Sequence, residues 1–237
     1  MGSSGLEFLA YVWLILSGIS FFVILLDMPQ QHLHMEVMKL VWPLTTLYMG
    51  PIALYAYWVW GRVSVVHEVD DERETAPLPS HSMMEHAHLQ PVEPSWRGTF
   101  LSATHCGAGC SLGDIIGEIV IGLTGLIIGG SSLLTSYVVD FVLAFAMGIA
   151  FQYYSIVPME GLTPSEGIRA ALKADTLSLV AFEVGMFAWM AVARTLVSSS
   201  PGDPVFWFMM QVAMMVGFGT SYPANWVLIR RGIKHAM

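Results

Sequence analysis

The sequence predicts an all-α fold, a polytopic bundle of about six transmembrane helices with both termini in the cytoplasm. Three observations predict it: the composition, the length of the apolar segments and the distribution of basic residues. Of 237 residues, 55% are hydrophobic and only 12% are charged. Soluble domains carry about 25% charged residues, so this chain has too little charge to cover a water-facing surface. We therefore expect an integral membrane protein of a bacterial inner membrane or plasma membrane.

Six segments are long and apolar enough to cross a hydrocarbon core, which takes about 20 helical residues. We place them near residues 8–26, 40–60, 109–128, 132–153, 176–196 and 205–229. The whole chain, residues 1–237, is then a single transmembrane bundle. Residues 62–98 form a long cytoplasmic loop within it, acidic at first and then rich in His and Met. Such a composition is typical of mobile segments.

The basic residues support this topology. Cytoplasmic loops are enriched in Lys and Arg, and six spans divide the basic residues eight to two between the sides. The cytoplasmic side receives Arg62, Arg73, Arg97, Arg169, Lys173, Arg230, Arg231 and Lys234, and the opposite side receives Lys39 and Arg194.

One face of the third expected span carries thiols and carboxyl groups. Side chains four residues apart advance by only about 40° around a helix, so Cys106, Cys110, Asp114 and Glu118 form one stripe. Three glycines, also four residues apart, lie beside this stripe and allow a neighbouring helix to approach closely. We therefore expect the stripe to face the interior of the bundle.

Two thiols one helical turn apart, with His105 adjacent, suit a soft cation such as Cu(I), Zn(II) or Hg(II). The alternative is that Cys106 and Cys110 are buried as small hydrophobic side chains. Because two intramembrane acids continue the same stripe, and such acids are costly in lipid, we favour a metal site of His105, Cys106, Cys110, Asp114 and Glu118.

A second candidate site precedes the second span, on the side with few basic residues. It comprises His32, His34 and Met38, again side chains that suit a soft metal ion. The alternative is an interfacial segment whose methionines contact lipid.

Further polar and Met residues recur at helical spacing in the later spans. They gather on narrow arcs of the helical wheels, which indicates a lining inside the bundle. A Met stripe more often packs a core, whereas a carboxyl group in lipid either stays protonated or attracts a cation. The transport path that we expect is lined by Asp140, Asp175, Glu183, Met186, Met190, Met210, Met214 and Asn225.

These side chains favour a carrier or channel for a soft transition-metal ion, with copper preferred, over an enzyme. The expected partners are the lipid bilayer, the metal ion, and a soluble metal donor or acceptor protein or a second copy of the chain. The alternatives are a membrane thiol or haem oxidoreductase and a metal-sensing or scaffold subunit. A net charge of -8 disfavours nucleic-acid binding, and the sequence has no Walker motif through which bound ATP would drive transport.

Four blocks of sequence carry a resemblance to a known family. The most specific is the Cys block from His105 to Glu118. The others are Val41–Pro51, Phe182–Met186 and Pro223–Trp226. Together they resemble the family of integral membrane proteins called domain of unknown function 4396. The resemblance implies a multi-spanning membrane protein and leaves the activity to be argued from the residues.

Overall fold

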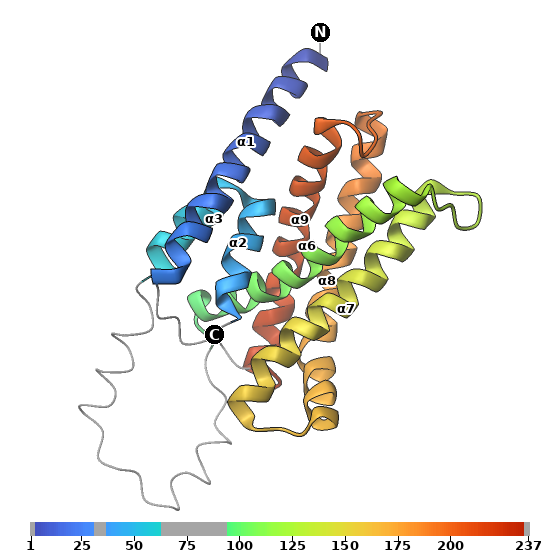
Figure 1. Ribbon diagram of the computed structural model, residues 1–237. Coiled ribbons are helices and arrows are strands. Elements are labelled where there is room, and N and C mark those ends of the chain that lie inside the picture. Colours follow the sequence, from blue (N-terminus) through green and yellow to red (C-terminus); the bar gives the residue numbers. More distant parts are fainter. Residues whose placement is uncertain (1–2, 31–36, 63–93, 235–237) are drawn as a thin grey trace, which may run out of the picture.

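The computed structural model describes residues 3–30, 37–62 and 94–234, and these are almost entirely helical (Figure 1). Five helices are long and apolar enough to cross a membrane: α1 (Ser3–Asp27), α6 (Trp96–Thr124), α7 (Ser132–Glu160), α8 (Pro164–Leu196) and α9 (Pro204–Arg230). The shorter elements are the 3-10 turn η1 (Met28–Gln30), α2 (Met38–Met49), α3 (Pro51–Ala56) and the π-helical turn η2 (Tyr57–Gly61). The prediction of an all-α polytopic bundle is confirmed. Most of the predicted 62–98 loop lies outside the described residues.

Local sequence signals set the helix ends. Ser95 caps α6 by accepting a hydrogen bond from the Gly98 amide at 3.0 Å. Thr163 and Glu166 form a capping box at the start of α8, where Pro164 occupies a position that needs no amide hydrogen. These caps pair the amides that the first turn of a helix leaves free.

The second expected span, residues 40–60, is a helical hairpin and not one continuous helix. α2 enters the bundle, and α3 returns toward the end from which α2 began (Figure 1). The reversal falls at Gly50, whose φ of 54° is a conformation that glycine adopts readily, and Pro51 then starts α3 without an amide hydrogen. At the base of the hairpin, Arg62 pairs with Asp27 of α1 at 3.0 Å, and Tyr57 donates to the same carboxylate at 2.6 Å.

Five spans and a re-entrant hairpin place the two termini at opposite ends of the bundle (Figure 1). Five candidate spans among the described residues agree with the expected bundle of about six, and the cytoplasmic location of both termini stays a prediction. The hairpin also brings Lys39, in the first turn of α2, to the end that holds Arg62. Of the basic residues in the described chain, only Arg194 then lies at the other end, so the charge asymmetry is stronger in this topology than in the expected one.

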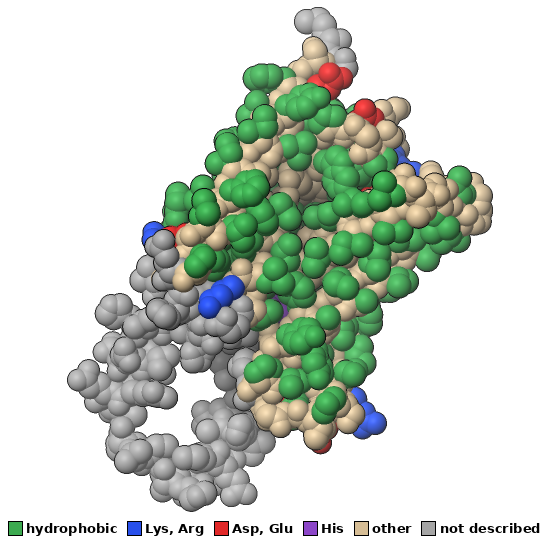
Figure 2. Space-filling view, in the orientation of Figure 1, with side chains coloured by type: hydrophobic (Ala, Val, Ile, Leu, Met, Phe, Trp, Pro, Cys, Tyr) green, Lys and Arg blue, Asp and Glu red, His purple; other side chains and the backbone are tan. Residues whose placement is uncertain are grey.

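The outer surface of the bundle is apolar along the length of the helices. Figure 2 shows hydrophobic side chains over most of this face, with the described charged side chains gathered toward its margins. Large side chains such as Phe22, Leu123 and Val184 are well exposed, a pattern that a lipid environment explains and water does not. We take the end that carries most basic residues as the cytoplasmic end and the other as the outer end.

The helices pack around two buried clusters. The larger joins α6, α7, α8 and α9 to the tip of the α2–α3 hairpin, and it contains Cys106 and Cys110. The smaller lies between α1, the hairpin and the cytoplasmic end of α6, around Trp42 and Tyr57. The hairpin therefore closes one side of the cluster that holds the thiols.

Candidate functional site: a buried column of thiols and carboxyl groups

The stripe on α6 faces the protein interior, as its sequence predicts. Cys106, Cys110 and Asp114 are fully buried, and Glu118 is only 3% exposed. At a rise of about 1.5 Å per residue, the stripe extends for about 18 Å along the helix. It thus forms a column of polar and sulfur groups through the middle of the bundle.

Small residues determine which way the stripe points. A Cβ atom added at Gly109 or Gly113 would overlap the backbone of α7 at Gly148 or Ala144. One added at Gly117 would meet Asp140. Because α7 packs directly against this glycine face, the adjacent stripe of α6 is turned toward α8 and the hairpin.

The thiol pair forms the centre of the column. The two thiols lie close enough to each other to interact, and the carboxyl group of Glu183 on α8 lies beside Cys110. From the hairpin, Tyr48 packs over Gly107 and contributes its hydroxyl group to the same region. Two separate elements, α8 and the hairpin, therefore converge on Cys106 and Cys110 of α6.

Methionines form an apolar, sulfur-rich wall in the same cluster. The four that the sequence assigns to the transport path are all buried, and each belongs to the cluster that holds the thiols. They are Met186 and Met190 of α8 and Met210 and Met214 of α9. Their thioether sulfurs add soft ligands to the surroundings of the thiols.

Several buried carboxyl oxygens have no hydrogen-bond partner. Both oxygens of Asp114, both of Glu183 and Oδ1 of Asp140 are in this state. These groups also interact electrostatically with one another, because α6, α7 and α8 bring them together. Buried polar groups are normally paired, so such a concentration of free acceptors favours binding of protons or a cation.

At the outer end, the column widens into a cavity of about 10 Å³. Such a volume holds about one water molecule. Glu118 and Asp140 line it from α6 and α7, and Arg194 and Met190 line it from α8. The cavity therefore brings together a basic group, two carboxyl groups and methionine thioethers.

At the cytoplasmic end lie Asp175 and Asn225, which the sequence assigns to the transport path. Both residues already have a hydrogen-bond partner. The ammonium group of Lys234 donates to Asp175 at 2.6 Å and to Asn225 at 2.8 Å. Both residues are fully buried. At this level the expected transport path holds a buried ion pair, and its part in transport stays a prediction.

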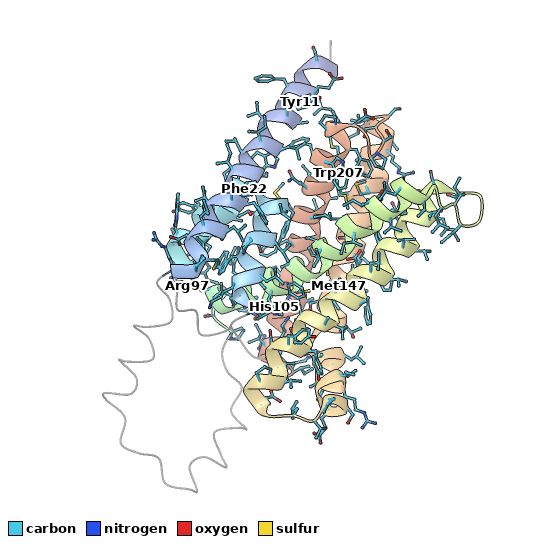
Figure 3. The ribbon with its side chains drawn as sticks, viewed as in Figure 1. Tyr11, Phe22, Arg97, His105, Met147 and Trp207 are labelled. Atoms are coloured by element: carbon cyan, nitrogen blue, oxygen red, sulfur yellow. The ribbon has the colours of Figure 1, made fainter. Side chains whose placement is uncertain are left out.

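His105 extends the column to that ion pair. Its ring is fully buried, and Nε2 forms a hydrogen bond of 2.7 Å with Ser155 of α7, whereas Nδ1 has no partner. Figure 3 places His105 in the lower part of the bundle, near the cytoplasmic ends of α6 and α7. It thus lies between the thiols and Lys234.

Of the candidate site at His32, His34 and Met38, the structure describes only Met38. Met38 packs in the smaller cluster with Met28 and Trp42, away from the thiols. It also lies at the cytoplasmic end, because the hairpin starts there. His32 and His34 lie outside the described residues. The site of these three residues therefore stays a prediction.

Two buried contacts were not predicted from the sequence. Lys234 lies beyond the last helix, where basic residues usually indicate only a cytoplasmic loop. Gln211 of α9 donates to the carbonyl oxygen of Leu47, near the end of α2. Helix ends inside a bilayer leave carbonyls that require donors, so a glutamine within an apolar span was the available signal.

In the described residues, carboxyl, imidazole and thiol groups alone do not form a complete metal site. In residues 3–30, 37–62 and 94–234, no three His, Cys, Asp or Glu side chains are close enough together to hold one metal ion. Cys106 and Cys110 would have to be joined by a thioether, or by a carboxyl group that moves. The metal site therefore stays a prediction.

The fold and the buried column define the class of the molecule: a polytopic helical membrane protein with a polar interior. The family model described as domain of unknown function (DUF4396) matches residues 95–234, which include α6 to α9 and Lys234. The chain belongs to this family. The matched region contains the whole column except Tyr48, and the Val41–Pro51 block lies outside it. No curated protein and no solved structure matches the chain.

Proposed function

We propose that this protein is a carrier or channel for a soft transition-metal ion, with copper preferred, in a bacterial inner membrane or plasma membrane. One observation carries the proposal: Cys106 and Cys110 lie at the centre of a bundle, beside the unpaired carboxyl group of Glu183 and a wall of buried methionines. Thiolates and thioethers select soft cations, and Cu(I) accepts both.

The order of groups along the column supports movement of a cation. From the outer end, an ion would meet Glu118 and Asp140 first, then Asp114 and Glu183, and then the thiols. A thiol or carboxyl group that binds a metal ion gives up its proton. At each step, therefore, a proton leaves as the metal ion arrives. Such an exchange keeps the net charge of the low-dielectric interior nearly constant, which limits the cost of desolvation.

Metal content tests the binding step. The purified protein, incubated with Cu(I) under reducing conditions and then desalted, should retain about one copper per chain. Cys106→Ser and Cys110→Ser should each lower this content strongly, because each removes one of two thiolates. Ser111→Ala is the matched control, since Ser111 is also buried in α6 and has no hydrogen-bond partner. Retained copper in both serine variants would contradict the thiol site.

Transport is tested in vesicles. Copper uptake into proteoliposomes should fall at least about tenfold when Glu183 becomes Gln, a change that removes the charge and keeps the shape; tenfold corresponds to about 1.4 kcal/mol. Ser111→Ala should leave uptake unchanged. Equal uptake by the parent protein and the Glu183→Gln variant would contradict a path along the column.

The alternative of a thiol oxidoreductase makes a different prediction. Reversible oxidation would join Cys106 and Cys110 in a disulfide, although helix geometry holds cysteines four residues apart near the upper limit for this bond. Both thiols are fully buried, which hinders exchange with a soluble redox partner. Thiol trapping that shows a reversible disulfide, in protein that binds no copper, would favour the oxidoreductase over the carrier.

A further inference from the structure

The C-terminal tail turns back into the bundle and carries Lys234 with it. α9 ends at Arg230, and Gly232, with a φ of 64°, reverses the chain. The amides of Ile233 and Lys234 then both donate to the carbonyl oxygen of Leu228, at 3.0 and 3.3 Å. As a result, the Lys234 side chain is only 1% exposed.

Oxygen atoms from α8 and α9 surround the ammonium group. Asp175 Oδ1 and Asn225 Oδ1 accept its hydrogen bonds at 2.6 and 2.8 Å. Ser178 donates to the same carboxylate oxygen at 2.7 Å. The amide nitrogen of Asn225 donates to Ser221 at 2.9 Å, which orients the amide oxygen toward the ammonium group. The surroundings are thus built for a positive charge and consist of hard ligands.

The carboxylate retains capacity for a further ligand. Asp175 Oδ2 is buried without a partner, and so is His105 Nδ1, which lies near enough to interact electrostatically with both Asp175 and Lys234. On α8, Asp175 precedes Glu183 by two helical turns, about 12 Å. The oxygen-lined group is therefore placed at the cytoplasmic end of the column.

We propose that Asp175, Asn225 and Ser178 form a binding site for a small monovalent cation, and that the ammonium group of Lys234 is its tethered occupant. A lysine ammonium is a compact point charge, comparable to a free ammonium ion. Because Lys234 follows the end of α9 by only four residues, the tail can leave the site without unwinding the helix. Release of the tail opens the site to a cation from the cytoplasmic side. This inference does not depend on the metal proposed above.

Chemical rescue tests the site. Lys234→Ala leaves Asp175 without its counter-charge and should lower the Tm of the detergent-purified protein. Methylammonium chloride should restore most of this loss, whereas choline chloride at equal ionic strength should not, because choline is too large for a site shaped around a lysine ammonium. The parent protein and Arg231→Ala, an exposed neighbour in the same tail, should respond to neither salt.

Calorimetry supplies the direct measurement. Methylammonium should bind Lys234→Ala with a stoichiometry near one, and adding Asp175→Asn to that variant should abolish binding. A folded Lys234→Ala protein that responds equally to methylammonium and choline would overturn the proposal.

A folding failure would also be informative. If Lys234→Ala is recovered only when methylammonium is present during purification, the site is supported. If methylammonium does not help, while the uncharged pair Asp175→Asn with Lys234→Met folds, then the contact is purely structural and the proposal is overturned. Neither result bears on copper binding at Cys106 and Cys110, so the two proposals fail separately.

Discussion

Glu183 ends in a carboxyl group whose two oxygens have no hydrogen-bond partner, although the residue is only 2% exposed. An unpaired buried polar group costs stability, by about 1–3 kcal/mol for a group of this kind. Groups retained at such a cost are characteristic of functional sites, where activity and stability oppose each other. At the scale of single residues, the column is therefore a place where the protein sacrifices stability.

We therefore predict that Glu183→Met stabilises the protein while it abolishes copper uptake. Methionine has a similar shape and suits the neighbouring Met186, so the free energy of unfolding should rise by about 1–3 kcal/mol. Thermal unfolding in detergent measures the first effect, and vesicle uptake measures the second. A variant that is less stable than the parent would indicate that the Glu183 carboxyl group has a partner in the folded state.

Substitution of Gln211 should change the free energy of unfolding in the opposite direction. Its amide satisfies the carbonyl oxygen of Leu47 at the end of α2, so Gln211→Met should destabilise the protein by about 1–3 kcal/mol. Gln152→Met is the matched control, because Gln152 is also buried and its Oε1, like that of Gln211, has no partner, whereas the carbonyl oxygen of Leu47 accepts its hydrogen bond from Gln211. Equal losses of Tm in the two variants would show that the contact with the hairpin contributes nothing specific.

At the scale of elements, the contact between α6 and α7 fixes the direction of the stripe. Gly113 has no room for a Cβ atom, because that atom would overlap the backbone of Ala144. The two helices must therefore separate or rotate if a side chain is added, and rotation would move the thiols away from α8.

We accordingly predict that Gly113→Ala destabilises the protein by about 1–3 kcal/mol and lowers copper content. Gly122→Ala in the same helix is the control, since its Cβ would approach nothing closer than Pro201, at 4.0 Å. In an exposed helical position, alanine is even favoured over glycine by about 1 kcal/mol. Similar Tm values for the two variants would contradict the close packing of α6 and α7.

The elements also show what the sequence can and cannot predict. Helical periodicity and the neighbouring glycines correctly predicted that Cys106, Cys110 and Asp114 face inward. The burial of such a stripe follows from the local sequence pattern alone. The hairpin was not predicted, because residues 40–60 are as apolar as a true span, and only Gly50 followed by Pro51 distinguishes them. Contacts between residues that are far apart in the sequence, such as that of Lys234 with Asp175, produce no periodic pattern around either residue.

At the scale of the whole molecule, the count of spans decides which end of the column faces which compartment. If the five candidate spans of the described residues are the spans that cross the membrane, the N-terminus lies on the side of Arg194 and the C-terminus on the side of most other basic residues. The thiols then lie nearer the cytoplasmic end than the carboxyl pair of Glu118 and Asp140.

Cysteine labelling in intact cells tests this topology. Ser4→Cys and Ser198→Cys should react with a membrane-impermeant maleimide added outside, and Ser165→Cys should react only after the membrane is opened. All three positions are exposed. The two native cysteines are fully buried, so they should not react with the maleimide. Labelling of Ser4→Cys only after opening would restore an even number of spans.

X-ray absorption at the copper edge of protein loaded with Cu(I) shows directly which atoms surround the bound metal. We predict sulfur ligands from two thiolates, which should disappear in the Cys106→Ser, Cys110→Ser double variant and persist in Ser111→Ala. A spectrum with only oxygen or nitrogen neighbours, or one that the double substitution leaves unchanged, would contradict a soft-metal site within the column.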